Sequence, residues 1–205
     1  MGYGMEEENF LMFSKRIERA AELVVKAHDG QFRKDEKTPY YKHPFEVAKL
    51  VQKSLDLTDS VYGEACLISA LAHDCVEDVK DFDLDEFVNA IYMDKNCERE
   101  KSAVKEMVIV LTKNPLIEGR HNRDMDSYER ILNSSYSGSS AIIKLCDRYS
   151  NVSDMGGMTE VFKMRYIAET FLLLGYLNRY KDYKIYQDLM KLADNKLKEV
   201  SKGLS

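Results

Sequence analysis

The sequence Leu-Ala-His-Asp-Cys-Val-Glu-Asp at residues 71–78 decides how the rest of the chain is interpreted. It brings four side chains of ligand or acid–base type into six positions: His73, Asp74, Glu77 and Asp78. The apolar residues before it predict a buried helix, and if that helix continues through Asp78, the acidic groups lie on neighbouring faces of one turn. Carboxylates buried together need a positive partner, and a divalent metal is the simplest one. A solvated helix end, where the charges meet only water, is the alternative.

Length and composition bound the class of protein. The chain has 205 residues, 44% of them apolar, which is enough for a sizeable core, so we expect a single domain over residues 1–205. A net charge of −5 argues against a general nucleic-acid binder, although it permits a small phosphorylated ligand held by a few local cations. These properties do not indicate an oligomeric state.

Three features predict a cytoplasmic protein. No apolar run approaches the roughly 18 residues that cross a bilayer, so no membrane segment is expected. The acidic residues 1–9 lack a signal-peptide pattern. The cysteines show no paired close spacing and are interpreted as reduced, mostly buried thiols: Cys66, Cys75, Cys97 and Cys146.

Helical periodicity recurs along almost the whole chain, which contains only three prolines and ten glycines, and it predicts an all-α fold. The expected helices cover about residues 8–29, a segment from Pro44 through Val51, the stretch leading into His73, residues 83–91 and 104–111, a segment around Tyr128, and residues 159–180 and 182–202. Asp59 or Ser60 can cap the third of these, and Asp83 with Glu86 resembles a capping box.

Two connections and one ambiguous segment complete this prediction. Residues 116–126, which contain Arg120, His121 and Arg123, are expected to form a loop. The serine- and glycine-rich residues 134–140 are expected to form a turn. Residues 141–146 are strongly apolar but too few for periodicity to distinguish a helix from a buried strand.

Two further ligand candidates lie far from the first stretch. His43 stands thirty positions before His73, at the expected start of a helix. Asp147 stands seventy-three positions after Asp74. Each has a simpler interpretation, His43 as a helix-start residue and Asp147 as the ion-pair partner of an adjacent cation. Spacings this long are not in themselves a metal signature.

Four segments occur in a fixed order: AHDGQFRK at residues 27–34, PYYKHP at 39–44, LAHDCVED at 71–78 and IKLCDRYSN at 143–151. They resemble AHxGQxRK, PYxxHP, LLHDxVED and IKLADRLHN in the hydrolase domain of the RelA/SpoT enzymes, and especially in the stand-alone small alarmone hydrolases. Their histidines and aspartates match the H…HD…D pattern of the HD superfamily. The match runs from about residue 20 to 175 and implies a single-domain HD-type helical bundle.

The resemblance implies a metal-dependent phosphohydrolase with one Mn²⁺ ion per chain, held by His43, His73, Asp74 and Asp147. Glu77 and Asp78 match the family's Glu-Asp pair, which prepares the attacking water. The chemical reason is that a metal lowers the pKa of bound water, while a nearby carboxylate takes the proton as the water attacks phosphorus. The implied reaction removes the 3′-pyrophosphate from the alarmone (p)ppGpp and gives GDP or GTP and pyrophosphate.

Substrate contacts also follow from the resemblance. Arg33 and Lys34 match residues that meet the nucleotide, since a guanidinium can stack on a base and both cations can neutralise phosphates. Asn151, four residues after Asp147 and so on the same helical face, falls on a family ligand position, as does Thr170. The alternatives are a solvated cation pair for Arg33 and Lys34, and plain helix filling for Thr170.

Other residues keep two interpretations, and one departs from the family. Arg120 and Arg123 could reach a pyrophosphate or belong to a mobile surface loop, and His28 is interpreted as a structural hydrogen-bonding residue. Ser153 stands where the family has an arginine, which removes one charge-assisted nucleotide contact of about 1–3 kcal/mol. Two other functions therefore remain open: hydrolysis of another ribose-phosphorylated nucleotide or a nucleoside monophosphate, and non-catalytic nucleotide sensing.

Overall fold

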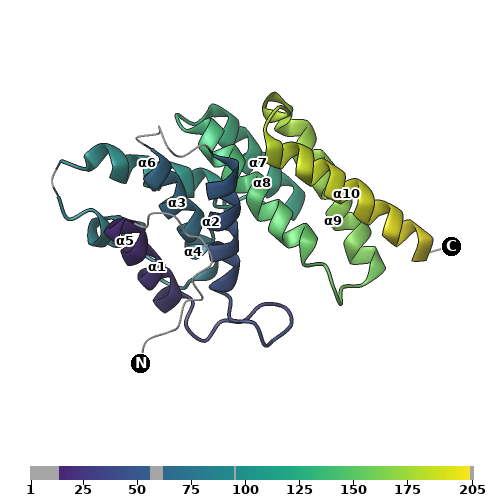
Figure 1. The fold of residues 1–205 in the computed structure, drawn as a ribbon, viewed down its shortest axis with the longest axis horizontal. Coiled ribbons are helices and arrows are strands. Elements are labelled where there is room, and N and C mark those ends of the chain that lie inside the picture. The colour runs from purple at the N-terminus through teal and green to yellow at the C-terminus, as the bar shows by residue number, and fades with distance from the viewer. Residues whose placement is uncertain (1–13, 56–61, 95, 204–205) are drawn as a thin grey trace.

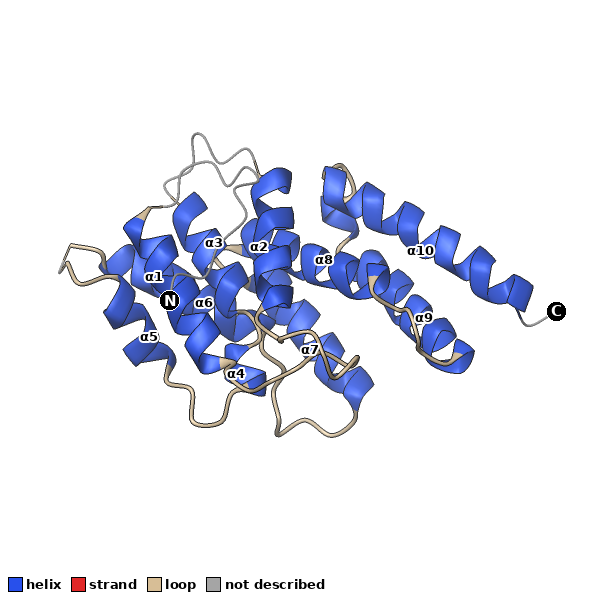
Figure 2. Cartoon of the chain, turned by 60° about the horizontal axis from the view of Figure 1, so that its bottom comes forward, coloured by secondary structure: helices blue, strands red, loops and turns tan. Residues whose placement is uncertain are grey.

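The computed structural model describes residues 14–55, 62–94 and 96–203. Within these ranges the regular structure is helical, apart from one isolated antiparallel β-bridge between Phe32 and Pro39 (Figures 1 and 2). The expected all-α class is therefore confirmed. Residues 141–146, which periodicity could not assign, lie inside a long helix.

The helices follow one another as α1 (Lys15–Ala27), α2 (Lys42–Ser54), α3 (Gly63–Ala72), α4 (Cys75–Asp78), α5 (Leu84–Ile91), α6 (Glu98–Leu111), α7 (Arg120–Asn133), α8 (Ser137–Ser153), α9 (Glu160–Tyr176), the 3₁₀ turn η1 (Asn178–Tyr180) and α10 (Lys184–Gly203). The expected cap at Asp83 is present, because its Oδ1 accepts a hydrogen bond from the backbone N–H of Glu86 at 2.9 Å. Asp59 and Ser60 lie outside the described residues, and α3 begins at Gly63.

Helix α3 lies at the centre of the N-terminal part of the chain. All of its residues except Glu64 are buried, as expected for a helix that is apolar on almost every side. It packs against α1, α2, α6 and α8, so residues that follow its C-terminal end are held on several sides. His73 is the first of these residues.

Helix α8 joins this part of the molecule to the C-terminal helices. It packs against α2, α3, α6 and α7 on one side and against α9 and α10 on the other. Figure 1 shows α9 and α10 side by side at the C-terminal end of the molecule, opposite α1 and α5. Asp147 near the middle of α8 is thereby placed against the N-terminal helices that carry the candidate histidines.

The expected loop at residues 116–126 is wrong, because α7 begins at Arg120. Its buried face contains Asp124, whose carboxylate oxygens lie 3.6 Å from Lys113 Nζ and 3.9 Å from Arg120 Nε. The part of this helix around Tyr128 was expected, but periodicity detects apolar side chains and therefore misses its first residues, where the inner face carries a buried carboxylate paired with cations. His121 at the start of this helix is exposed.

Several other boundaries differ from the prediction. α8 begins at Ser137 within the expected turn, and α2 begins at Lys42, with Pro44 tolerated because the N–H groups of a first helical turn need no helical partner. The first helix ends at Ala27, and its expected residues 8–13 lie outside the described ranges. The helix through residues 71–78 is interrupted by a turn at His73 and Asp74, after which α4 supplies a single turn.

The four cysteines are free thiols and all are buried, as expected. Burial raises the pKa of the Cys66, Cys75 and Cys146 thiols to about 12, so these groups stay protonated at neutral pH. Cys75 is therefore a packing residue. Within the described ranges no helix is both long and apolar enough to cross a membrane.

Candidate functional site

The turn between α3 and α4 orients His73. Its Nδ1 lies 2.8 Å from the carbonyl oxygen of Ala70 and donates to it, which leaves the lone pair on Nε2. Nε2 is buried and has no hydrogen bond to any other described residue, although Asp74 Oδ2 is 3.1 Å away. A buried imidazole nitrogen in this condition is suited to bind a cation.

His43 is oriented in a similar way from the first turn of α2. The hydroxyl of Ser150 donates to Glu46 Oε2 at 3.0 Å and therefore accepts from His43 Nδ1 at 3.2 Å. The lone pair of His43 Nε2 then faces Asp147 Oδ1 at 3.2 Å and Asp74 Oδ2 at 3.6 Å. His43 is only 3% exposed, so this residue at the helix start points into the molecule.

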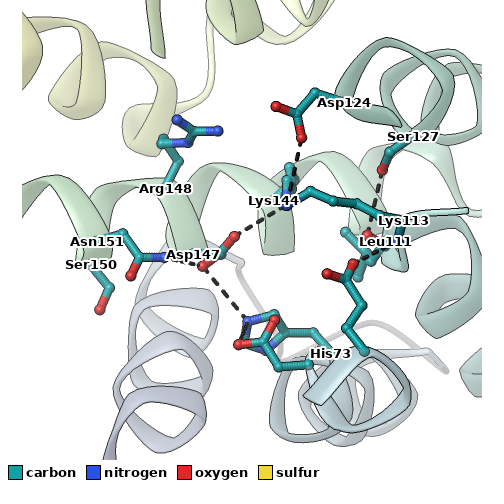
Figure 3. Close-up of polar contacts among 12 residues, drawn as sticks. His73, Leu111, Lys113, Asp124, Ser127, Lys144, Asp147, Arg148, Ser150 and Asn151 are labelled. Carbon is teal, nitrogen blue, oxygen red and sulfur yellow. Dashed lines mark hydrogen bonds and ion pairs between the residues drawn. The ribbon is translucent and has the colours of Figure 1, made fainter. Parts of the chain in front are cut away.

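The two carboxylate oxygens of Asp147 have different partners. Oδ1 faces the histidines and accepts a hydrogen bond from Asn151 Nδ2 at 2.6 Å. Oδ2 forms an ion pair with Lys144 Nζ at 3.2 Å, and Figure 3 shows the carboxylate between Lys144 and His73. Asp147 is thereby oriented to offer one oxygen to a shared ligand.

Residues from three distant segments therefore converge. His43, His73 and Asp147 each offer one ligand atom, and these atoms lie within 4.8 Å of one another. Asp74 completes the group through its contacts with both imidazoles. Two imidazole nitrogens and two carboxylates form a donor set that divalent first-row metals accept, so the residues present fit such an ion.

The charges of the cluster formed by His43, His73, Asp74 and Asp147 favour the binding of a cation there. Burial would raise the pKa values of Asp74 and Asp147, yet His73 beside Asp74 and Lys144 beside Asp147 hold both well below the ordinary value. Burial would likewise lower the pKa of His73, but Asp74 and Asp147 raise it well above the usual range, so a proton competes with a metal cation for the lone pair on Nε2. Both carboxylates are therefore charged at neutral pH and form a concentrated negative site.

Glu77 and Asp78 are exposed beside this group, on the single turn of α4. Asp78 Oδ2 lies 2.7 Å from the hydroxyl oxygen of Tyr40, which is also 2.9 Å from Asp74 Oδ2. Glu77 Oε1 accepts a hydrogen bond from the backbone N–H of Lys113 at 2.5 Å. The two carboxylates thus have fixed partners, and Tyr40 links one of them to the candidate ligand Asp74.

A pocket of about 230 Å³ adjoins the cluster, between the α1–α2 loop and the segment from α8 to α9. Its lining residues are Arg33, Lys34, Asp35, Asn151, Asp154, Gly156, Gly157, Met158, Phe162 and Tyr166. The structure therefore brings together three of the four predicted substrate contacts, Arg33, Lys34 and Asn151. Arg33 Nη2 lies 3.3 Å from Asn151 Oδ1 and 3.1 Å from Asp154 Oδ2, so the pocket is connected to Asp147 through Asn151.

Thr170 is not among the residues that line the pocket. It is fully buried in α9, and its hydroxyl donates to the carbonyl oxygen of Tyr166 at 2.7 Å. Its placement supports the alternative interpretation of helix filling. Ser153, where the family has an arginine, is exposed and donates to the carbonyl oxygen of Tyr149 at 2.9 Å, so it adds no positive charge to the pocket.

Sequence reasoning assigned no role to several residues of the site. Phe162 and Tyr166 form the aromatic wall of the pocket, with ring centroids 5.7 Å apart and nearly parallel planes. Lys34 Nζ lies 4.7 Å from the centroid of the Phe162 ring. The guanidinium carbon of the buried Arg148 lies 4.3 Å from the centroid of the Tyr166 ring. No motif marks these aromatic residues. Tyr40 lies within the PYYKHP segment at residues 39–44, and this placement three residues before His43 was the signal that could have identified it.

The comparisons with known proteins agree with this geometry. No family model matches the chain. The guanosine-3′,5′-bis(diphosphate) 3′-pyrophosphohydrolase MESH1 of Xenopus tropicalis is 44% identical over 63 residues, and that of Homo sapiens is 44% identical over 68 residues. These matches cover 30% and 33% of this chain and only 33% and 35% of the relatives, about a third of their length.

A solved structure, described as that of a metazoan ortholog of SpoT that hydrolyses ppGpp, has a TM-score of 0.72 with this chain at 23% identity. The superposition covers 90% of this chain and 97% of that protein. The chain therefore has the helical fold of that protein, and about a third of its sequence is similar to the MESH1 pyrophosphohydrolases.

Proposed function

We propose that the chain is a metal-dependent pyrophosphohydrolase that removes the 3′-pyrophosphate from (p)ppGpp and produces GDP or GTP and pyrophosphate. The observation that carries this proposal is the convergence of His43, His73, Asp74 and Asp147 beside a pocket that contains Arg33 and Lys34. The sequence similarity to MESH1 proteins and the shared fold support the same reaction. The four buried free thiols support a cytoplasmic location.

His43, His73, Asp74 and Asp147 would hold one Mn²⁺ ion. Bound there, the ion supplies Lewis acidity toward a phosphate oxygen and lowers the pKa of an attacking water. The mixed nitrogen and oxygen donors suit Mn²⁺, and the choice among divalent metals rests on the family resemblance.

The remaining chemistry is assigned to side chains of this chain. Glu77 and Asp78 accept and carry the proton of the water that attacks the phosphorus next to the ribose 3′ oxygen, because they are the exposed carboxylates beside the metal ligands. Arg33 and Lys34 offset the charge of the phosphates. Phe162 and Tyr166 offer the flat apolar surface against which a purine can pack.

Two alternatives are kept by specific observations. The missing cation at Ser153 favours a phosphohydrolase for another ribose-phosphorylated nucleotide or a nucleoside monophosphate. The pocket cations Arg33 and Lys34 would equally suit a nucleotide sensor that binds without turnover. The sensor requires Glu77 and Asp78 to be dispensable.

We expect the protein to release pyrophosphate from ppGpp and pppGpp in the presence of Mn²⁺, and to lose this activity when EDTA removes the metal. Adding Mn²⁺ in excess of the chelator restores it, because the four ligands re-bind the ion. The measurement is product release from a panel that also contains GDP, GTP, GMP and 3′-phosphorylated adenosine nucleotides. Cleavage of other panel members alone supports the first alternative, and binding of ppGpp without turnover supports the sensor.

A further inference from the structure

The loop between α1 and α2 is fastened to α4 by a chain of hydrogen bonds. Gln31 Nε2 donates to the backbone oxygen of Asp78 at 2.9 Å, and Gln31 Oε1 accepts from His28 Nδ1 at 2.7 Å. His28 is buried, and its ring lies 4.8 Å from that of Tyr40. The backbone N–H of Tyr40 donates to the carbonyl oxygen of Gln31 at 2.9 Å. The loop therefore holds both the backbone of Asp78 and the ring of Tyr40.

The hydroxyl of Tyr40 has two carboxylate neighbours but only one proton to donate. Its oxygen lies 2.7 Å from Asp78 Oδ2 and 2.9 Å from Asp74 Oδ2. A phenol hydroxyl carries a single proton, so it can donate fully to only one of the two carboxylates at a time. Asp74 also faces His43 and His73, where a cation can neutralise it, whereas the Asp78 carboxylate is exposed. We therefore expect the Tyr40 hydroxyl to donate its hydrogen bond to Asp78.

We propose that Tyr40 is a positioning residue, whose hydroxyl holds the Asp78 carboxylate beside the metal ligands while Gln31 holds the Asp78 backbone. This inference rests on the proposed function. A carboxylate on an exposed one-turn helix would otherwise sample several rotamers, and a general base works only within hydrogen-bond reach of the proton it accepts. Tyr40 restricts that freedom without contacting the reacting atoms itself.

The test compares Tyr40→Phe with the adjacent Tyr41→Phe, whose ring packs edge-on against Phe45. We expect Tyr40→Phe to lower kcat about 10- to 100-fold, the usual effect of losing an outer hydrogen-bond partner at a metal site. KM and the Mn²⁺ affinity measured by calorimetry should change less than about threefold, because the pocket and the four ligands are retained. Tyr41→Phe should behave like the wild type.

A double-mutant cycle identifies the residue through which Tyr40 acts. If Tyr40 acts by holding Asp78, then Tyr40→Phe added to Asp78→Asn should lower kcat by less than about twofold more. Effects that multiply in the double variant, or a loss of Mn²⁺ affinity as large as the loss in kcat, would overturn the inference.

Crystal structures of the wild type and Tyr40→Phe separate this inference from the proposed function. We expect the Asp78 carboxylate to move while His43, His73 and Asp147 stay in place. An unmoved Asp78 would overturn the role of Tyr40 whether or not the protein cleaves ppGpp. A wild-type protein without pyrophosphohydrolase activity would instead overturn the proposed reaction, and the displacement of Asp78 would still decide the role of Tyr40.

Discussion

Replacing Asp147 with asparagine should lower ppGpp hydrolysis by at least about a thousandfold. The carboxylate provides the oxygen that faces both histidines, and a neutral amide offers a much weaker ligand to a divalent ion. A metal contributes several kcal/mol of charge stabilisation to phosphoryl chemistry, and each 1.36 kcal/mol or so corresponds to a factor of ten in rate. The measurement is initial-rate hydrolysis at saturating Mn²⁺, together with Mn²⁺ titration by calorimetry.

Folding must be shown to persist in this variant, because Asp147 is also the ion-pair partner of Lys144. Removing one member of a buried pair costs about 3–5 kcal/mol, but the asparagine oxygen can still accept from Lys144, so we expect a smaller loss and a native circular dichroism spectrum. Asp188→Asn is the matched control, because this partly exposed aspartate of α10 is also paired with a lysine of its own helix, Lys184, and the variant should retain full activity. Near-normal hydrolysis by Asp147→Asn would contradict the assignment of Asp147 as a ligand.

Replacing Glu77 and Asp78 together with glutamine and asparagine should reduce hydrolysis by about 10²–10⁴-fold, the range expected when a general base is removed. Unlike Asp147→Asn, this change should leave Mn²⁺ affinity within about threefold of the wild type, since neither side chain is among the proposed ligands. In Glu77→Gln/Asp78→Asn the hydrolysis rate should therefore fall while Mn²⁺ affinity is kept, whereas in Asp147→Asn both should fall.

The matched control for the double variant is Glu98→Gln, an exposed carboxylate at the start of α6 that pairs with Lys101. It should hydrolyse ppGpp at the wild-type rate. A Glu77→Gln/Asp78→Asn protein that keeps wild-type turnover would remove these residues from the reaction. If the wild type binds ppGpp without hydrolysing it and the double variant binds it equally well, the sensor is supported instead.

The fold was predictable from sequence because most helices bury an apolar stripe that periodicity detects. The part of α7 around Tyr128 was predicted as a helix, but its first residues were expected to be a loop, since the inner face there carries Asp124 paired with Lys113 and Arg120. The interruption between α3 and α4 also escaped detection, because His73 and Asp74 continue the helical spacing. That turn directs His73 Nε2 toward Asp147, so the local feature that escaped periodicity is the one that orients the site.

The sequence identified some individual residues of the site, but it did not show which residues from distant segments meet there. Side-chain chemistry identified His73 and Asp74, but no spacing rule connects them with His43 or Asp147, and only the family resemblance did so. The contact by which Ser150 on α8 orients His43 on α2 depends on helix packing, which periodicity does not encode. The Lys144–Asp147 pair, by contrast, is a local contact three residues apart on α8. Thr170 shows the converse, because a residue matched by sequence position lies buried with its hydroxyl bonded to its own helix.

The most direct test of the central claim, that four side chains share one cation, is anomalous diffraction from crystals grown with Mn²⁺. We predict a single strong manganese peak among the Nε2 atoms of His43 and His73 and the carboxylates of Asp74 and Asp147, absent from crystals treated with EDTA. Crystals that show no peak there at saturating Mn²⁺, or a peak that His43 and Asp147 do not contact, would contradict it.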